Sequence, residues 1–284
     1  MAIIYKGSEV VEALNNNIIA AVEELKTQGV VPTLAILRVG ERGDDISYEK
    51  GATKRAEKVG VAIKNVILPA DVAEEVLVEE IEKLNQDSSV HGVLMFRPLP
   101  KHINEDRVRN LLAAEKDIDG ITDLSLAGVF AGIPTGFAPC TPSACMEILD
   151  YFGVDCKGKK AVVVGRSLVV GKPAAMMLLD RHATVTVTHS RTVDLPSVVR
   201  AADIVIACIG KAKMINADYL APDQIVIDVG INVLEDGSLS GDVDFAAAEN
   251  IVGAITPVPG GVGTVTTSVS MKHVVEAAQR SLKI

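Results

Sequence analysis

Three small residues after an apolar run could build a phosphate-binding turn. Gly165, Ser167 and Gly171 follow the run 159–164, and Pro173 comes soon afterwards. Glycine allows a tight turn at the end of a strand. Proline favours the start of a helix, whose unpaired N–H groups attract anions. The GxSxxxG spacing departs from the GxGxxG fingerprint of dinucleotide loops, so an ordinary strand-to-helix turn stays open as an alternative.

The residues after the next apolar run bear on which dinucleotide would bind. An NAD site usually carries Asp or Glu there, to accept a hydrogen bond from the ribose hydroxyl. This chain has His189, Ser190 and Arg191 instead, and no carboxylate before Asp194. With Arg166, the side chains of Ser190 and Arg191 could donate to a 2′-phosphate. We therefore predict NADP rather than NAD as the cofactor, the alternative being ordinary polar residues of a loop.

These residues need a sheet to position them, and the chain has the rhythm of a parallel one. The predicted strands after the turn are 183–189, 203–210 and 224–230, with a short helix at 195–202. Continuous Val and Ile runs suit strands that helices cover on both faces. The fold class is therefore α/β, with a Rossmann-type doubly wound parallel sheet. We add Gly210, at the end of the third strand, and Ile231, after the fourth, to the cofactor-binding residues.

The first half of the chain shows an α/β alternation of its own. The predicted helices are 8–27, 45–59 and 73–85, and the predicted strands are 32–39, 62–68 and 91–96. A further helix is expected with Thr141 as N-cap and Pro142 at its first position, and a last one at 264–282. We therefore predict two domains, 1–140 with 265–284 and 141–264.

Composition narrows the class of protein. The chain has 284 residues, more than one average core holds, and 48% of them are apolar. A net charge of -9 argues against nucleic acid as a partner. The four cysteines have neither CxxC spacing nor a histidine cluster, so we expect no metal site and no disulfide framework. The absence of a long apolar run predicts no membrane association and a cytoplasmic location.

Several motifs together resemble one family. GRSLVVGKP, ATVTVTHSRT, VIDVGIN, GDVDF and PVPGGVG occur in this order, and KDIDG and PCTP precede them. The chain is similar in these motifs to the methylenetetrahydrofolate dehydrogenase/cyclohydrolase family. The resemblance implies an enzyme of one-carbon metabolism, serving purine biosynthesis, that is usually a homodimer. It also implies a folate site in the cleft between an α/β substrate domain and the cofactor domain, with Pro259, Gly260 and Gly261 among the substrate-binding residues.

The family's two activities need different residues. Hydride transfer from 5,10-methylenetetrahydrofolate to the nicotinamide mainly requires two aligned rings, whereas hydrolysis of the methenyl product requires a positioned acid or base. The resemblance implies Tyr48 and Asp119 as catalytic and substrate-binding residues. The family's lysine, four positions after the tyrosine, is Ala52 in this chain, and the glutamine of its GxxxQLPLP pattern is Phe96.

These two departures shape the predicted activity. Ala52 lies on the same helix face as Tyr48, which we expect to point inward, whereas nearby lysines form a stripe on the other side: Lys50, Lys54 and Lys58. We predict an NADP-dependent dehydrogenase with weak or lost cyclohydrolase activity, the hydrolysis being left to a separate protein. The alternative is a bifunctional enzyme that moves protons with other groups and makes 10-formyltetrahydrofolate.

Overall fold

The computed structural model describes residues 1–282 of the chain, which divides into two compact units. We name them after their main sheets. The six-stranded unit comprises Met1–Glu12 and Thr141–Thr266, and the three-stranded unit comprises Ala13–Cys140 and the described residues from Thr267 onward. The expected division had kept the first twelve residues with the three-stranded part. They group instead with the larger sheet because its edge strand is formed by residues 3 and 4.

The sheet of the six-stranded unit has the order β1-β11-β8-β7-β5-β6, and every neighbouring pair is parallel. Its strands are β1 (Ile3–Ile4), β5 (Lys160–Val164), β6 (Thr184–Thr188), β7 (Ile204–Ala207), β8 (Ile225–Asp228) and β11 (Ala254–Ile255). The chain moves outward from β5 to β6 and then returns to the other side of β5 with β7. The predicted doubly wound parallel sheet is confirmed, and the strands are one to three residues shorter at their C-terminal ends than expected.

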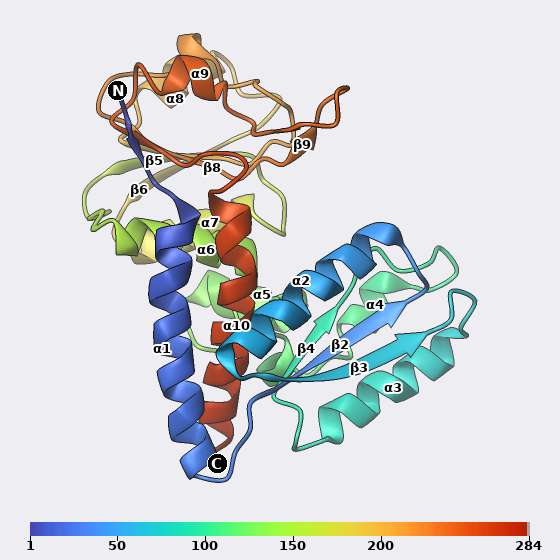
Figure 1. The fold of residues 1–284 in the computed structure, drawn as a ribbon. Helices are drawn as coiled ribbons and strands as arrows, with labels where there is room; N and C mark the ends of the chain where they lie inside the picture. Colours follow the sequence, from blue (N-terminus) through green and yellow to red (C-terminus); the bar gives the residue numbers. More distant parts are fainter. Residues whose placement is uncertain (283–284) are drawn as a thin grey trace. The chain divides into compact units, whose positions relative to one another are not determined.

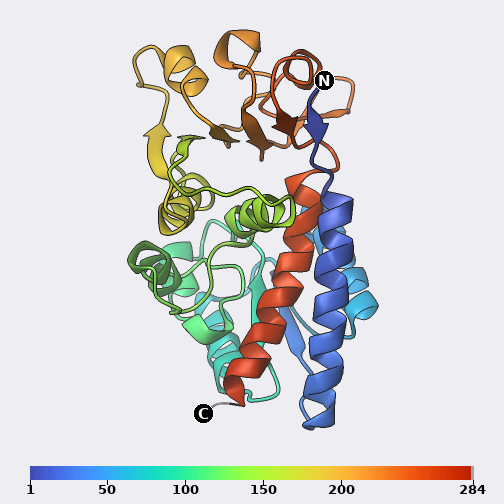
Figure 2. The ribbon, with the colours of Figure 1, turned by 90° about the vertical axis from the view of Figure 1, so that its left-hand side faces the viewer.

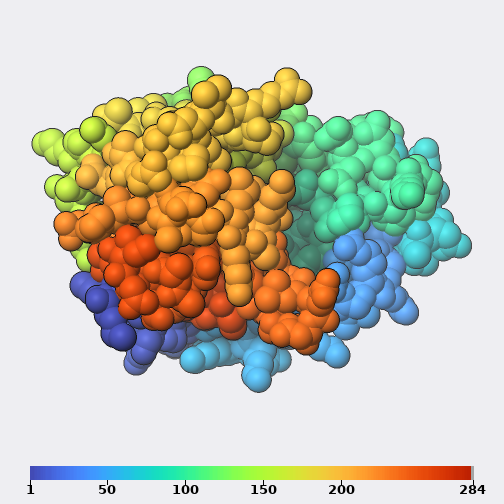
Figure 3. All heavy atoms as spheres, turned by 90° about the horizontal axis from the view of Figure 1, so that it is seen from above, coloured from blue at the N-terminus to red at the C-terminus, as the bar shows by residue number. Residues whose placement is uncertain are grey.

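Helices cover both faces of this sheet (Figure 1). They are α6 (Cys140–Tyr151) and α7 (Gly171–Asp180) on one face, and α8 (Leu195–Arg200) and α9 (Phe245–Ala248) on the other. A short hairpin of β9 (Asn232–Val233) and β10 (Leu239–Ser240) follows β8. Seen from above in Figure 3, the atoms that follow β6 in the chain, yellow to orange-red, form most of the visible surface of this unit. The start of α6 corrects one prediction, because the helix begins at Cys140 and Thr141 lies inside its first turn.

In the three-stranded unit, β2 (Thr33–Val39) lies between β3 (Ala62–Leu68) and β4 (Gly92–Met95), and both pairs are parallel. The helices are α1 (Gly7–Thr27), α2 (Gly43–Val59), α3 (Glu74–Gln86), α4 (Glu105–Arg109), α5 (Asp123–Ala131) and α10 (Val262–Ser281), of which α1 and α10 begin in the other unit. Figures 1 and 2 both show α1 and α10 side by side, and within this unit Ser268 Oγ donates to Asn15 Oδ1 at 3.2 Å.

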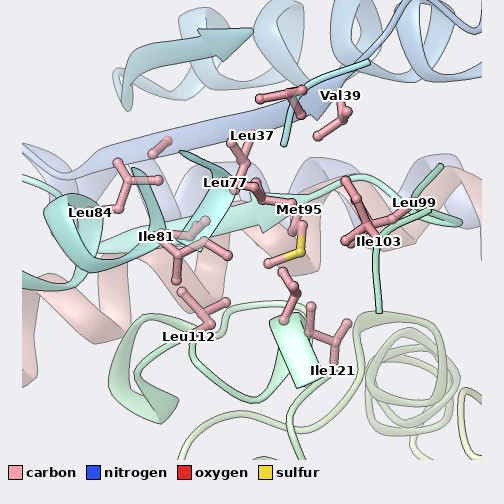
Figure 4. Packing of buried hydrophobic residues seen from close by; sticks show 14 of the residues in the cluster. Leu37, Val39, Leu77, Ile81, Leu84, Met95, Leu99, Ile103, Leu112 and Ile121 are labelled. Carbon is pink, nitrogen blue, oxygen red and sulfur yellow. The ribbon is translucent and has the colours of Figure 1, made fainter. Parts of the chain in front are cut away.

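The core of the three-stranded unit follows from the spacing of its apolar residues. Leu77, Ile81 and Leu84 recur on one face of α3 and are buried, as expected for an amphipathic helix against a sheet. Figure 4 shows them packed against Leu37 of β2 and Met95 of β4. All four residues of β4 are buried, so both faces of this strand are covered. This packing holds β4, and the residues that follow it, in place.

Two further expectations concern the whole described chain. Within residues 1–282, no helix is long and apolar enough to cross a membrane. The four thiols are free, and three of them are buried: Cys140, Cys145 and Cys156.

Candidate active site

Tyr48 and Phe96 meet in the three-stranded unit. Tyr48 lies on α2 and Phe96 directly follows β4; their ring centroids are 5.7 Å apart and the rings are nearly perpendicular, at 84°. The exposed fraction is 39% for Tyr48 and 9% for Phe96. Ala52 is buried on the same helix face, as are Ala56 and Val59, which confirms the prediction that this face points inward. The two rings therefore form an apolar wall, with part of Tyr48 exposed.

Local contacts hold this part of α2 in place. Two acidic residues in the first turn favour the positive end of the helix dipole, and Gly60 ends the helix in the left-handed conformation, with φ 80°. Arg38, at the end of β2, donates from Nε to Glu49 at 2.6 Å, and both side chains are largely buried. Arg42 donates to the carbonyl of Pro98 at 3.1 Å. These contacts tie the residues around Tyr48 to the end of β2 and to the loop that carries Phe96.

Asp119 lies in the turn before α5, and its carboxylate faces Cys140. The backbone N–H of Cys140 hydrogen-bonds to this carboxylate, and its thiol can donate either to the same carboxylate or to the carbonyl oxygen of Ile118, 3.1 Å away. Burial raises the pKa of Asp119 to about 6, with a further increase from neighbouring Asp117, whereas the Cys140 bonds and the charge of Arg97 act in the opposite direction. The carboxyl group can therefore gain or lose a proton near neutral pH.

A second carboxylate shapes the turn that carries Asp119. Asp117 is fully buried and accepts from the backbone N–H groups of Ile121, at 3.0 Å, and Thr122, at 2.8 Å, and from the hydroxyl of Ser125, at 2.7 Å. Three donors to one carboxylate fix the backbone on both sides of Asp119. Asp117 is the structural carboxylate of this turn, and Asp119 is the one available to a ligand.

Side chains from α10 connect Tyr48 to Asp119. The Tyr48 hydroxyl hydrogen-bonds to Ser270, and Ser270 Oγ donates to the sulfur of Cys140 at 3.3 Å. His273 Nδ1 lies 2.8 Å from the carbonyl oxygen of Ile118, so this nitrogen carries the proton, because a carbonyl can only accept. The sequence reasoning missed Ser270 and His273, because only the fold brings α10 to this place; Cys140 stood within the PCTP motif.

The arrangement has a defined chemical capacity. Burial and the charge of Asp119 raise the pKa of Tyr48 well above its usual range, so its hydroxyl stays a donor. Asp119 is an acceptor whose protonation changes near neutral pH. An amine at position 52 and an amide at position 96 are both absent from the sequence. The site therefore offers a hydroxyl donor at Tyr48 and a titrating carboxyl acceptor at Asp119.

The predicted phosphate-binding residues gather at the C-terminal edge of the six-stranded sheet. Val164 of β5 pairs with Thr188 of β6, and the N–H of Gly165 donates to the carbonyl of Thr188 at 3.0 Å. The exposed side chains at this edge include Arg166, Ser190 and Arg191. Neither arginine takes part in an ion pair with any residue from 1 to 282. Both guanidinium groups can therefore bind an anion.

The glycines of this turn fit a dinucleotide. Gly165 has φ +134°, and a Cβ there would lie 2.4 Å from the carbonyl oxygen of Cys208. A Cβ on Gly171 would lie 2.4 Å from the carbonyl oxygen of Gly165. Only glycine permits so close an approach of strand, turn and helix, which is the packing that a Rossmann phosphate turn requires.

One detail of the predicted turn is wrong. The first N–H groups of α7 were expected to be unpaired and to face a pyrophosphate. In the structure Ser167 Oγ accepts from the N–H groups of Val170, at 3.1 Å, and Gly171, at 3.4 Å. The N-cap residue Val170 makes no side-chain hydrogen bond, so the Ser167 hydroxyl pairs with these N–H groups from the turn before α7.

The remaining predicted residues lie in the six-stranded unit. Gly210 follows β7 and Ile231 follows β8, so both stand at the same edge of the sheet as Gly165. Gly260 accepts from the N–H of Gly7 at 2.8 Å, and a Cβ on Gly261 would lie 2.4 Å from the carbonyl oxygen of Pro257. Gly261 is therefore required by packing and Gly260 by its backbone conformation, with φ +102°, and the substrate contact of Pro259, Gly260 and Gly261 stays a prediction.

Comparisons with known proteins also assign a cofactor-binding part and a catalytic part to this chain. The family model described as tetrahydrofolate dehydrogenase/cyclohydrolase, NAD(P)-binding domain, matches residues 139–282, and the catalytic-domain model of that family matches residues 5–119. A protein of Alkaliphilus oremlandii called bifunctional protein FolD is 50% identical over 279 residues, which are 98% of each chain.

Solved structures show the same likeness. The bifunctional enzyme FolD, a methylenetetrahydrofolate dehydrogenase/cyclohydrolase from Campylobacter jejuni, has a TM-score of 0.96 at 35% identity, over 99% of each chain. The N5,N10-methylenetetrahydrofolate dehydrogenase-cyclohydrolase of Trypanosoma brucei has a TM-score of 0.92 at 34% identity, over 100% of this chain and 99% of that one. The latter was solved in complex with NADP cofactor and an inhibitor.

Proposed function

Because this chain belongs to the tetrahydrofolate dehydrogenase/cyclohydrolase family, we propose that it oxidises 5,10-methylenetetrahydrofolate to the 5,10-methenyl form with NADP as hydride acceptor. The observation that carries the proposal is the glycine turn at Gly165 and Gly171, with Arg166 and Arg191 exposed beside it. The guanidinium group of Arg191 follows β6, where an NAD site has a carboxylate, and that of Arg166 follows the neighbouring strand β5, so both favour a 2′-phosphate. The Trypanosoma brucei relative was solved with this cofactor.

The three-stranded unit would bind the folate. Asp119 would accept hydrogen bonds from the N–H groups of the heterocycle, and the Tyr48 ring, held edge-on by Phe96, would form one wall of the site. NADP, when bound, supplies the hydride acceptor. The residues of the chain then have to keep two rings aligned, a positioning task that needs no proton donor. On this proposal Asp119 and Tyr48 hold the folate for hydride transfer, and this step does not need the lysine and the glutamine that the family has at positions 52 and 96.

The hydrolysis of the methenyl product is the finer question. The relatives are called bifunctional, and this favours the bifunctional alternative over the predicted loss of cyclohydrolase activity. In a bifunctional enzyme with Ala52 and Phe96, protons would have to move through other groups. Asp119 is the group with a suitable pKa, about 6, and the Tyr48 hydroxyl could hold the water. A separate cyclohydrolase would then be unnecessary.

One observation favours the second candidate, a dehydrogenase with little hydrolysis. Ala52 is buried, and Phe96 packs its ring against Tyr48. An apolar wall offers water no hydrogen bond, and neither residue can act as acid or base. The side chains that the family uses for this step are both missing here, while the binding residue Asp119 is kept.

A single spectrophotometric experiment tests the proposal. Methylenetetrahydrofolate with NADP should give reduced cofactor at a rate at least about tenfold higher than with the same concentration of NAD. Methenyltetrahydrofolate supplied alone should then decay clearly faster than in buffer if the enzyme is bifunctional. Accumulation of the methenyl product at the buffer decay rate would leave only the dehydrogenase, and no reduced cofactor at all would refute the assignment.

We further propose that the protein works as a homodimer in the cytoplasm and supplies one-carbon units for purine biosynthesis. The family resemblance supports these three points. Light scattering on the purified chain checks the first, and equal masses for the protein and for a single chain of 29.9 kDa would exclude it.

A further inference from the structure

A pair of buried carboxylates lies under the end of β7 and β8 in the six-stranded unit. Asp242 is fully buried, and the exposed fraction of Asp228 is 3%. The N–H of Asp242 itself donates to Asp228 Oδ1 at 3.0 Å. A buried charge is costly unless donors surround it, so two neighbouring ones need a reason.

Asp242 binds the loop that follows β7. Its carboxylate accepts from three successive backbone N–H groups, those of Ile209, Gly210 at 2.9 Å and Lys211 at 2.8 Å. Successive N–H groups around a residue with positive φ form a concave anion site, and Gly210 has φ 72°. Here the anion is a side chain of the protein, and the result is a loop fixed in one conformation.

The same two carboxylates hold the segment that follows β8. Asn232 Nδ2 donates to Asp242 Oδ1 at 3.0 Å, and the N–H of Gly230 donates to Asp228 Oδ1 at 3.0 Å. Ile231, between these two residues, is exposed. The carboxylate pair thus anchors both residues that flank Ile231, while Ile231 itself faces outward.

Two close approaches explain why glycines accompany the pair. A Cβ on Gly241 would lie 1.9 Å from Asp228 Oδ2, and a Cβ on Gly230 would lie 2.3 Å from Asp242 Oδ1. Side chains at these positions would push the carboxylates away from their donors. The motifs VIDVG and GDV are therefore two halves of one structural device.

The place of this device in the sheet suggests its role. In a doubly wound sheet the dinucleotide lies across the C-terminal edge, with one half on each side of the point where the strand order reverses. β5 and β6 carry the predicted phosphate and 2′-phosphate residues, so the ends of β7 and β8 lie on the nicotinamide side. We infer that Asp242, supported by Asp228 and Asn232, is a positioning residue that fixes Gly210 and Ile231 for the nicotinamide half of the cofactor. The inference rests on the proposed use of NADP.

A comparison of two ligands tests this role apart from general stability. The ligands are NADPH, which carries both halves, and 2′,5′-ADP, which carries only the adenosine half. For Asp242→Asn we expect NADPH to bind about tenfold more weakly, equal to ~1.4 kcal/mol, and 2′,5′-ADP to bind within about twofold of the wild type. NADPH fluorescence gives the first constant and competition gives the second.

A second variant covers the case in which Asp242→Asn does not fold. Asn232→Ala removes only one donor to Asp242 and should weaken NADPH about threefold, again without affecting 2′,5′-ADP. Gln224→Leu is the matched control: this buried residue precedes β8 at the opposite edge and makes hydrogen bonds to Val199, Ala202 and Ala221. It should lower the melting temperature and leave both dissociation constants unchanged.

The outcomes separate the two hypotheses. Equal weakening of both ligands in Asp242→Asn or Asn232→Ala, or no change in NADPH binding, would overturn the positioning role. The same selective loss in Gln224→Leu would also overturn it, because any loosening of the sheet would then suffice. A wild-type protein that binds neither ligand would instead contradict the proposed cofactor.

Discussion

The two sites are built from different materials. At the edge of the six-stranded sheet, backbone geometry does most of the work: Gly165 and Gly171 permit contacts that no other residue allows, and Asp242 holds a loop by its N–H groups. At the proposed folate site of the three-stranded unit, single side chains would carry the chemistry. Tyr48 and Asp119 fit the family pattern, whereas Ala52 and Phe96 depart from it.

The difference teaches where an enzyme of this kind can change. A residue that the backbone packing requires cannot be replaced without moving a strand, so the cofactor edge keeps its pattern. A side chain that lines a site can be exchanged for another if the neighbouring side chains stay packed. The ring of Phe96, which packs edge to face against Tyr48, keeps such packing. On the proposed assignment, we expect such an exchange to affect proton transfer more than binding and hydride transfer.

The largest expected effect separates the two sites most sharply. Asp119→Asn removes the charge from the folate site, and hydrogen bonds to charged groups contribute ~1.5 to 3 kcal/mol. We expect kcat/KM of the dehydrogenase to fall about a hundredfold, with the dissociation constant of NADPH unchanged. The control is Asp123→Asn, an exposed carboxylate paired with Arg109, which should stay within about twofold. A loss below about fivefold in Asp119→Asn would remove this residue from the site.

The next effect concerns the other side of the comparison. Arg166→Ser with Arg191→Ser removes two exposed donors, and at ~1 kcal/mol each the preference for NADP over NAD should fall about thirtyfold. The measurement is kcat/KM with each cofactor. The control is Arg181→Ser. It removes one arginine just before β6, at the opposite edge of the sheet, where the guanidinium group is paired with Asp150. An undiminished preference in the double variant would show that these arginines do not read the phosphate.

The sequence predicts these two sites unequally well. The parallel sheet and the turn at Gly165 follow from apolar periodicity and glycine spacing, which are local properties. The Ser167 hydrogen bonds span only three and four residues, but the residue types of the turn do not distinguish a serine that pairs with the helix start from one that faces a ligand. The link from Tyr48 through Ser270 and Cys140 to Asp119 could not be predicted, because it depends on which helix faces which turn. A buried network between residues more than 100 positions apart leaves no period in the sequence.

A smaller effect tests whether the altered wall limits hydrolysis. Ala52→Lys with Phe96→Gln places the family's two side chains on the inward face, and we expect decay of methenyltetrahydrofolate to increase about tenfold over wild type. Each single variant should give less, because the amide and the amine act together. Burial lowers the pKa of a lysine, which keeps part of it neutral and able to accept a proton. If the wild type already hydrolyses efficiently and the double variant adds nothing, other groups carry the step.

The smallest effect is a shift in pH dependence. Asp119 must be ionised to accept from the folate, so kcat/KM should rise with pH through its pKa of about 6 and fall about tenfold for each unit below it. The thiol of Cys140 can donate to Asp119 or to the carbonyl of Ile118, 3.1 Å away, and its single proton serves one at a time. Its bond to Asp119 stabilises the ionised form and lowers the pKa.

Cys140→Ala removes this donor, so the acidic limb of the profile should move to higher pH, by less than about one unit. Cys140→Ser keeps a donor and should hold the limb at or below its wild-type position. Cys145→Ala, which removes a buried thiol further along α6, is the matched control and should leave the limb in place. A limb that moves equally in Cys145→Ala would assign the effect to packing of the helix. A limb that stays in place in Cys140→Ala would mean that the thiol is bonded to Ile118 and that Asp119 is held by the backbone N–H alone.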